Sequence, residues 1–324
     1  MLDGKNILVT GGTGSFGHQI IDELLKHSPN EIIIFSRDED KQYRMKLDYG
    51  HNSHVKFMIG DVRDRQRIQK ACRGIDLIFH AAALKQVPSN EDHPLEAVKT
   101  NIEGAYNVTQ AAIDMGVKKV VAVSTDKAVK PVNVMGMTKA IQERIMLSEN
   151  SNKHDTQFVC VRYGNVVGSR GSVVPLFKKK IDEGKPLPIT DKRMTRYLLT
   201  LPESIDLVFT AAEQGMPGDL FVKKMPASTV VDLAKVMGYE LGGRKDYPIE
   251  FTGIRPGEKI HEVLVSEEEL IRTKDIGNYY VVVPYWRASE ISQPPREHEY
   301  TSENTERLDH EGIANVLKKA GWIK

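Results

Sequence analysis

Cysteine is scarce in this sequence, and long apolar stretches are missing from it. Only Cys72 and Cys160 occur among the 324 residues, which excludes a disulfide framework or a cysteine-based metal site and favours a reducing compartment. No apolar run reaches the length of about 18 residues that a membrane span requires, and the chain starts directly with a strand pattern instead of a signal peptide. These absences predict a soluble, cytoplasmic protein with no membrane contact.

An excess of charge of either sign is missing as well. Lys and Arg number 45 against 44 Asp and Glu, which gives a formal net charge of +1. Nucleic acid and anionic membranes are therefore not expected as partners. The histidines show no ligand spacing, so no metal is expected. With 40% hydrophobic and 27% charged residues, the composition is that of an ordinary globular protein, and the length suits one large unit plus a smaller lobe.

Short apolar runs alternate with longer amphipathic segments through the first half of the chain. The predicted strands are Asn6–Thr10, Glu31–Phe35, Val55–Ile59, Leu77–His80, Lys119–Ser124 and Phe158–Arg162. The main predicted helices between them are His18–Lys26, Asp64–Ala71, Pro94–Met115 and Gly136–Glu149. This alternation is typical of βαβ units and predicts an α/β fold, a Rossmann-like doubly wound parallel sheet buried on both faces.

The strand–helix rhythm changes at about residue 163, after which Pro and Gly become frequent. We therefore predict a smaller C-terminal substrate-binding lobe beside the nucleotide-binding domain. The expected division is a Rossmann domain at 1–165 with 202–222 returning to it, a substrate lobe at 166–201 and 223–285, and a C-terminal strap and helix at 286–324.

The segment GGTGSFG follows the first predicted strand and opens the first predicted helix. Glycine in such a turn lets backbone N–H groups and the helix N-terminus approach a pyrophosphate closely. A tight turn without a ligand is the alternative, but the strand–turn–helix context favours a dinucleotide. The cofactor-binding residues predicted here are Gly11, Thr13, Gly14, Ser15, Phe16 and Gly17.

Cations lie at the tip of the second predicted strand, where NAD-binding sites usually carry an acidic residue. Ser36, Arg37 and Lys41 suit a ribose 2′-phosphate, so NADP is favoured as the cofactor, with NAD possible. In the alternative, Arg37 stacks on adenine and Asp38 or Glu39 binds the ribose of NAD. The motifs GDV and HAAA at the ends of the third and fourth strands add Asp61, Val62, Ala81, Ala82 and Ala83 to the predicted cofactor site.

A series of motifs extends over nearly the whole chain: GGTGSFG, GDV, HAAALKQVP, KTNIEGAYNV, STDKA, MGMTK, RYGNVVGSRGS and RPGEK, in that order. In these motifs the chain resembles the extended short-chain dehydrogenase/reductases. More narrowly, it resembles the soluble UDP-N-acetylglucosamine 4,6-dehydratases of surface-polysaccharide and glycan pathways. The resemblance implies a lyase that acts on a UDP-sugar with a nicotinamide cofactor, and a homo-oligomer, either a dimer or a larger ring.

The resemblance also implies a catalytic pair, Asp126 and Lys127, next to Thr125. Lys139 would bond the nicotinamide ribose, and the tyrosine usual four residues before it is Met135, which has no proton to exchange. Some inverting capsule-type members share this methionine. We expect Lys127, partly neutral through burial and nearby positive charge, to take protons from the C4 hydroxyl and C5. Asp126, protonated through burial, would protonate the departing C6 hydroxyl.

Both members of this pair can reach one sugar only if the strand ends before them, because adjacent strand residues point to opposite faces. In the alternative, STDKA is an ordinary strand end with Asp126 capping a turn and Lys127 in solvent. RPGEK likewise fits either a substrate contact or a simple Pro–Gly turn. The substrate-binding residues that the resemblance implies are Lys85, Tyr163, Asn165, Ser169, Arg170, Thr190, Arg196, Arg255 and Glu258, with Arg162 beside Tyr163 also lining the sugar and diphosphate.

Two other functions stay open at this point. A UDP-sugar 4-epimerase needs a base at O4 but no acid–base pair for C5 and C6, and Met135 removes the base that it would use. A non-catalytic NADP-binding sensor would need neither Lys139 nor the pair at 126–127.

Overall fold

Parallel strands form the centre of the computed structural model, which describes residues 2–169 and 171–324. Within these residues the first half of the chain alternates strands and helices. Its strands are β1 (Asn6–Thr10), β2 (Glu31–Ser36), β3 (Val55–Ile59), β4 (Leu77–His80), β5 (Lys119–Val123) and β6 (Gln157–Arg162). Its helices are α1 (Ser15–Leu24), α2 (Glu39–Tyr49), α3 (Arg65–Ala71), α4 (Val87–Asp92), α5 (Pro94–Ala97), α6 (Gly104–Asp114) and α7 (Val134–Glu149).

The second half contains shorter elements. Its strands are β7 (Leu187–Ile189), β8 (Thr195–Tyr197), β9 (Leu220–Lys223), β10 (Ala227–Thr229), β11 (Ile249–Phe251), β12 (Val263–Val265), β13 (Thr273–Asp275), β14 (Tyr279–Val282) and β15 (Tyr300–Thr301). Its helices are α8 (Val173–Asp182), α9 (Leu201–Gln214), α10 (Val230–Gly242), α11 (Glu267–Leu270) and α12 (His310–Lys319). None of the described helices is long and apolar enough to cross a membrane.

The main sheet has the strand order β13-β14-β9-β6-β5-β4-β1-β2-β3. Neighbours from β9 to β3 are parallel, whereas β14 is antiparallel to β9, and β13 to β14. The predicted α/β class with a doubly wound parallel sheet is confirmed. The chain order reverses between β1 and β4, and this is the position at which open α/β sheets bind ligands.

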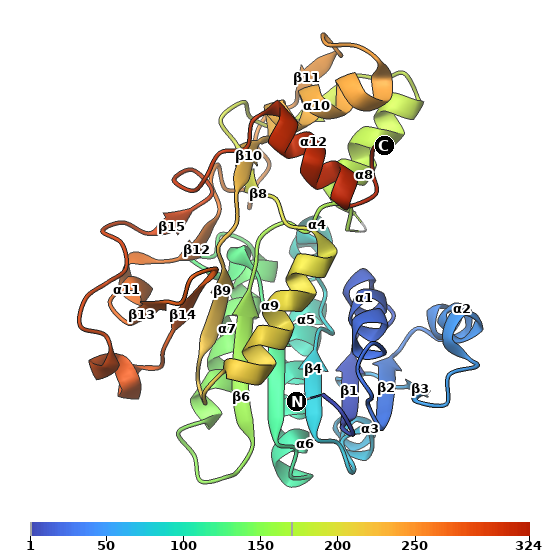
Figure 1. The fold of residues 1–324 in the computed structure, drawn as a ribbon, viewed down its shortest axis with the longest axis vertical. Coiled ribbons are helices and arrows are strands. Elements are labelled where there is room, and N and C mark those ends of the chain that lie inside the picture. The colour runs from blue at the N-terminus through green and yellow to red at the C-terminus, as the bar shows by residue number, and fades with distance from the viewer. Residues whose placement is uncertain (1, 170) are drawn as a thin grey trace.

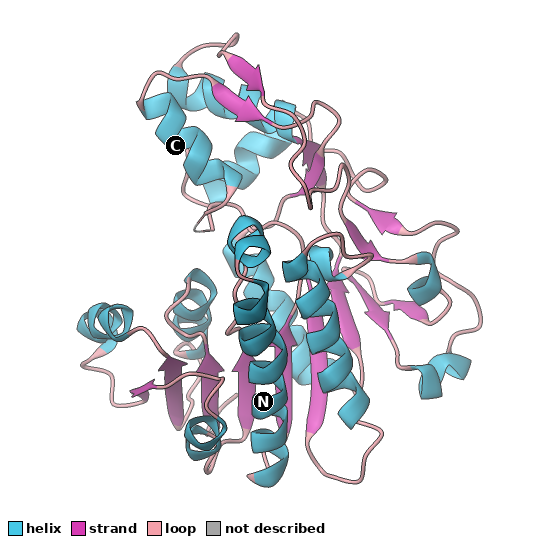
Figure 2. Cartoon of the chain, turned by 180° about the vertical axis from the view of Figure 1, so that it is seen from behind, coloured by secondary structure: helices cyan, strands magenta, loops and turns pink. Residues whose placement is uncertain are grey.

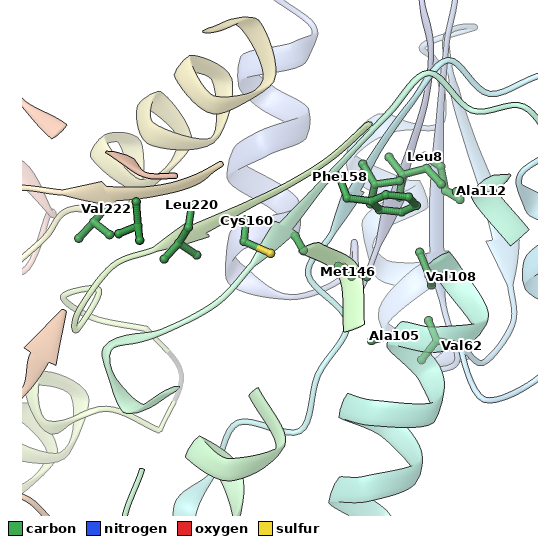
Figure 3. Packing of buried hydrophobic residues seen from close by; sticks show 14 of the residues in the cluster. Leu8, Val62, Ala105, Val108, Ala112, Met146, Phe158, Cys160, Leu220 and Val222 are labelled. Atoms are coloured by element: carbon green, nitrogen blue, oxygen red, sulfur yellow. The ribbon is translucent and has the colours of Figure 1, made fainter. Parts of the chain in front are cut away.

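Helices cover both faces of this sheet (Figures 1 and 2). On one face α3, α6 and α7 bury an apolar layer that includes Val108 and Met146 against Phe158 and Cys160 of β6 (Figure 3). On the other face α1 and α9 pack residues such as Ile20 and Leu207 against the same strands. Because both faces are buried, the strands read as continuous apolar runs in the sequence.

One predicted helix is divided in the structure. The segment Pro94–Met115 forms α5, a π-helical stretch at Val98–Glu103, and α6. The wider π-helical turn carries Asn101, whose side-chain oxygen accepts a hydrogen bond from the Leu84 N–H at 2.8 Å and whose amide donates to the Leu84 carbonyl at 3.0 Å. Such single π turns are frequent at functional sites, and this one fixes the loop after β4.

A smaller lobe lies above one end of the sheet and contains α8, α10 and α12 (Figure 1). The chain returns to the main unit through α9 and through β9, which pairs with β6. One boundary differs from expectation, because β13 and β14 extend the main sheet although we assigned residues 223–285 to the lobe. The four residues of β14 are all buried, and they gain this burial by pairing with β9.

Candidate active site

A cavity of about 370 Å³ lies where the strand order reverses, at the carboxyl ends of β1, β2 and β4. Most of the predicted cofactor residues line it, and so does Lys85, which we expected at the substrate. The predicted residues along its wall are Gly11, Thr13, Gly14, Ser15, Ser36, Arg37, Lys41, Asp61, Val62, Ala82, Ala83 and Lys85.

Glycine is required in the first turn of this cavity. Gly11 has a φ of +68°, and a Cβ placed there would lie 2.8 Å from the Ala82 Cα. Bare backbone therefore borders the cavity next to the start of α1, as close approach of a pyrophosphate requires. Gly17 has a different task, because its Cβ would lie 2.0 Å from the Gly12 carbonyl oxygen. It allows α1 to pack on the turn, and Phe16 and Ala81 likewise lie outside the cavity lining.

The tip of β2 presents a cation to the same cavity. Arg37 lies 3.6 Å from an Asp61 carboxylate oxygen, and Lys41 pairs with Asp38. The Asp38 carboxylate also caps α2 by accepting a hydrogen bond from the Lys41 N–H at 3.0 Å. It is therefore engaged by its own helix. Asp61, which we expected at the adenine, accepts hydrogen bonds from Arg63 as well.

The predicted catalytic pair lies on a turn that follows β5. This strand ends at Val123, and Asp126–Ala128 forms a 3₁₀ turn. The strand has therefore ended before the pair, which was the condition for both side chains to act on one ligand. Lys127 Nζ donates to Asp126 Oδ1 at 3.0 Å, and Thr125 Oγ1 donates to the same oxygen at 2.8 Å. Asp126 is fully buried, and the Lys127 side chain is 21% exposed.

The charges around the pair agree with one expectation and correct another. Burial raises the pKa of Asp126, and Glu262 raises it further, against the opposing effects of Lys127 and Thr125. This upward direction is the one that was expected for Asp126. Burial alone would lower the pKa of Lys127, but Asp126 and Glu262 outweigh it and raise this pKa. The expected partly neutral lysine is thus wrong for the ligand-free site, because two carboxylates face the ammonium.

Helix α7 brings Met135 and Lys139 to the same region. Met135 is 4% exposed, and a Cβ on the next residue, Gly136, would lie 2.2 Å from the Lys127 carbonyl oxygen. The first turn of α7 therefore packs directly on the catalytic turn. Lys139 Nζ donates to the Val123 carbonyl at 2.6 Å and to Gln142. Burial lowers the pKa of Lys139 to about 8, and its ammonium lies at the end of β5.

Apart from Lys85, the predicted substrate residues come from three segments that follow the first half of the chain. After β6, the Tyr163 carbonyl accepts a hydrogen bond from the Asp126 N–H at 3.2 Å, and Asn165 Oδ1 is buried without a partner among the described residues. Ser169 follows in the same loop, and Arg170 lies outside the described residues. On the second segment, Thr190 Oγ1 contacts Met194 Sδ at 2.9 Å.

The third segment is the RPGEK loop. The Arg255 N–H donates to a Glu258 carboxylate oxygen at 3.2 Å, and Arg255 is exposed. Arg196 of β8 reaches this loop, because its Nη2 donates to the Lys259 carbonyl at 3.0 Å. Asn133, which caps α7, donates to the Gly257 carbonyl at 2.8 Å. RPGEK is therefore a turn that is fixed against the catalytic region.

The amino-acid sequence matches a family model over residues 7–284, and that family is described as polysaccharide biosynthesis protein. The chain belongs to this family. It shares its fold with solved structures of nucleotide-sugar enzymes.

The relatives of this polysaccharide biosynthesis protein carry several names. A protein of Rickettsia akari named UDP-glucose 4-epimerase is 45% identical over 99% of this chain and 97% of its own length. The X-ray structure of Pen from Bacillus thuringiensis has a TM-score of 0.92 at 34% identity and covers 98% of each chain. The fold is also shared with DesIV, a dTDP-glucose 4,6-dehydratase of Streptomyces venezuelae with NAD bound, at a TM-score of 0.73 and 18% identity, covering 98% of this chain and 99% of that one.

We expected Arg162 to line the substrate, but in this polysaccharide biosynthesis protein its side chain is paired elsewhere. Its Nε donates to a Glu143 oxygen at 2.8 Å, and its Nη1 donates to a Glu269 oxygen at 2.9 Å. All three residues are buried. The side chain points from β6 toward α7 and α11, because alternate residues of a strand face opposite sides, and it ties these helices to the sheet.

Glu269→Gln is expected to destabilise the protein by about 3–5 kcal/mol, since it leaves part of the buried Arg162 charge unbalanced. The measurement is urea unfolding, with the exposed Glu267→Gln as a matched control that should change little. Burial opposes ionisation of Glu269, but Arg162 lowers its pKa to about 2 from an ordinary 4.5. The stability that ionised Glu269 contributes should be complete above the ordinary pKa of 4.5 and should fade as the pH falls toward about 2. Equal stability of both variants would contradict this role.

Sequence reasoning missed two residues beside the catalytic pair. Glu262 Oε1 lies 3.3 Å from Lys127 Nζ, and Lys259 Nζ donates to the Val129 carbonyl. Both lie in the segment RPGEKIHE, where a glutamate and a lysine look like ordinary surface charges. Only the packing of this loop on the catalytic turn reveals them. Nothing in the sequence indicated that Asn101, in the segment TNIEG, holds the loop after β4.

Proposed function

We propose that this protein is a UDP-N-acetylglucosamine 4,6-dehydratase that makes a UDP-4-keto-6-deoxy sugar. The observation that carries the proposal is the buried Asp126–Lys127 pair, which offers an acid and an amine 3.0 Å apart at the end of β5. Elimination of water from C5 and C6 needs a base for the C5 proton and an acid for the departing hydroxyl. Met135 offers neither, so it fills space beside the turn.

The cavity at the β1–β4 reversal is the place for the nicotinamide dinucleotide. Gly11, Gly14 and Ser15 line it and would hold the pyrophosphate. Lys139 lies outside this lining, at the end of β5, and would reach toward the nicotinamide ribose. A bound nicotinamide would supply the hydride transfer from C4 of the sugar to C6. The chain itself supplies the proton transfers.

Each member of the pair has a distinct task in the proposed reaction. Lys127 takes the C4 hydroxyl proton, releases it to solvent, and then takes the C5 proton, while Asp126 gives its own proton to the C6 hydroxyl, which departs as water. Lys127 carries its proton in the ligand-free site, and 21% of its side chain is exposed to water there. A sugar bound over the turn would remove this remaining hydration, which shifts the lysine toward its neutral form.

A UDP-sugar 4-epimerase is the second candidate, and the name of the 45% identical Rickettsia relative favours it. Epimerisation uses a base at O4 only, and it leaves a buried acid beside Lys127 without a task. The test is mass spectrometry of the product after incubation with UDP-N-acetylglucosamine. Loss of the mass of one water supports the dehydratase, whereas an unchanged mass with an altered C4 configuration supports the epimerase.

We also propose NADP as the preferred cofactor, although DesIV, which shares the fold, is described with NAD. Arg37 and Lys41 line the cavity, and Asp38 is engaged as the α2 cap. The homo-oligomeric state and the cytoplasmic location stay predictions.

Arg37→Ala is expected to weaken NADP binding by about tenfold or more, because it removes a charge-assisted contact to the 2′-phosphate. NAD binding should stay nearly constant. Fluorescence or calorimetric titration with each dinucleotide measures both affinities, and Arg44→Ala, which changes a highly exposed arginine of α2, is the matched control. A parallel loss of affinity for both dinucleotides would contradict a 2′-phosphate contact.

A further inference from the structure

Glu262 is a buried acid that faces the catalytic turn from another part of the chain. It directly precedes β12 and is 2% exposed. Its Oε1 lies 3.3 Å from Lys127 Nζ, on the ammonium that also donates to Asp126. The ammonium thus has two acidic side chains as neighbours, and only one of them belongs to the proposed catalytic pair.

The backbone around Glu262 is fixed on both sides. Its N–H donates to Ser302 Oγ at 2.9 Å, and its carbonyl accepts from the Ser302 N–H at 2.8 Å. Three residues earlier, the Lys259 ammonium donates to the Val129 carbonyl just after the catalytic turn. The distance between the Glu262 carboxylate and Lys127 is therefore set by the fold and not by a mobile side chain on the surface.

Cations surround this carboxylate. Arg196 Nε lies 3.7 Å from the same oxygen that faces Lys127. Burial opposes ionisation of Glu262, but Lys127, Arg196 and Lys259 outweigh it and lower its pKa. The charged and titratable groups that act on or near Asp126 are Lys127 on its own turn, Arg196 and Tyr197 on β8, and Lys259 and Glu262 before β12.

We propose that Glu262 is a positioning residue of the acid–base pair: its negative charge balances Lys127, so that Asp126 keeps the proton that it donates in catalysis. The inference rests on the proposed dehydratase function. Without Glu262, Asp126 would be the only carboxylate beside the ammonium. A carboxyl group in that position ionises, because an adjacent cation favours its charged form.

The second oxygen of each of the two buried carboxyl groups points away from the hydrogen bonds described above. Asp126 Oδ2 and Glu262 Oε2 have no hydrogen-bond partner within the described residues. A protonated carboxyl group donates through one oxygen, and Asp126 Oδ1 already accepts from Thr125 and Lys127. Oδ2 therefore has no contact with the ammonium, and a proton carried there could be given to a bound ligand.

The test is infrared spectroscopy of the protein together with a pH–rate profile. At neutral pH the wild-type protein should show the C=O stretch of a buried protonated carboxyl group, and Asp126→Asn should abolish it. Glu262→Gln should also abolish this band at neutral pH and restore it only in more acidic solution. In the same variant, kcat at neutral pH should fall by about tenfold or more.

The pH dependence of activity shows in which direction Glu262 shifts the pKa of Asp126. Asp126 must be protonated to act, so activity falls as the pH rises through its pKa. Loss of the Glu262 charge lowers that pKa, and the alkaline decline of activity should move to lower pH. Glu262→Asp, which keeps the charge, should restore both the band and the profile in part. The exposed Glu303→Gln, at a residue whose side chain is 64% exposed, is the control and should resemble the wild type.

The outcomes separate this inference from the proposed function. A wild-type protein without the Asp126 band overturns the inference, even if Glu262→Gln fails to fold. An unchanged band and profile in a folded Glu262→Gln variant overturn it as well. If the wild-type protein releases no water from UDP-N-acetylglucosamine, the proposed function fails, and the loss of the band in Glu262→Gln would still support the effect of Glu262 on Asp126.

Discussion

Lys127→Ala is expected to lower turnover of UDP-N-acetylglucosamine by about 10²–10⁴-fold, the range typical of a lost general base. Lys127 is the proposed base for both the C4 hydroxyl and C5, and its amine lies 3.0 Å from Asp126 Oδ1. The measurement is the rate of product formation by liquid chromatography. Turnover within a few-fold of the wild-type rate would remove Lys127 from the chemistry.

A second substitution separates chemistry from folding. Alanine at this position leaves the buried carboxylates of Asp126 and Glu262 without their common cation, which can destabilise the protein by itself. Lys127→Arg keeps the positive charge but cannot lose its proton. We expect it to be folded, to bind cofactor and to be nearly inactive. Lys178→Ala, which removes a surface pair with Asp182 on α8, is the matched control and should retain wild-type turnover.

Asp126→Asn is expected to lower the rate of water loss by about 10²-fold or more, because an amide cannot protonate the leaving C6 hydroxyl. Lys127 should still remove the C5 proton after C4 is oxidised. In heavy water the unreacted UDP-sugar should therefore acquire deuterium at C5 while little product forms. Proton NMR of the sugar measures this exchange directly.

This variant distinguishes the two tasks of the pair. If Asp126→Asn loses both water elimination and C5 exchange while cofactor binding is intact, Asp126 would act before elimination and the division of tasks would be wrong. Elimination at the wild-type rate would show that Asp126 is not the acid. The exposed Asp182→Asn provides a control for the substitution itself.

Much of the fold could be predicted from the sequence because its signals are local. The six strands of the first half were placed within one residue of their bounds, since parallel strands buried on both faces are short apolar runs between polar turns. The glycine turn after β1 was also predicted, because the left-handed conformation of Gly11 and its close contact with Ala82 allow few other residues. The division of Pro94–Met115 was missed, since a π-helical stretch has no local signature of this kind.

The candidate site was predicted less completely because its electrostatics depend on distant residues. Asp126 and Lys127 were found through their motif, but the charge of Lys127 depends on Glu262, which lies 135 positions further along the chain. Arg162 was assigned to the substrate from its neighbours in RYGN, whereas the strand register turns it toward Glu143 and Glu269. Sequence shows which side chains are available; contacts between remote segments decide which of them meet.

The central claim is that the buried pair at 126–127 removes water from a UDP-sugar, and one incubation tests it most directly. The wild-type protein is mixed with UDP-N-acetylglucosamine and cofactor in heavy water, and the product is analysed by proton NMR. We predict a 4-keto-6-deoxy sugar with deuterium at C5. A product that retains its C6 hydroxyl and its C5 proton and differs from the substrate only at C4 would contradict the claim.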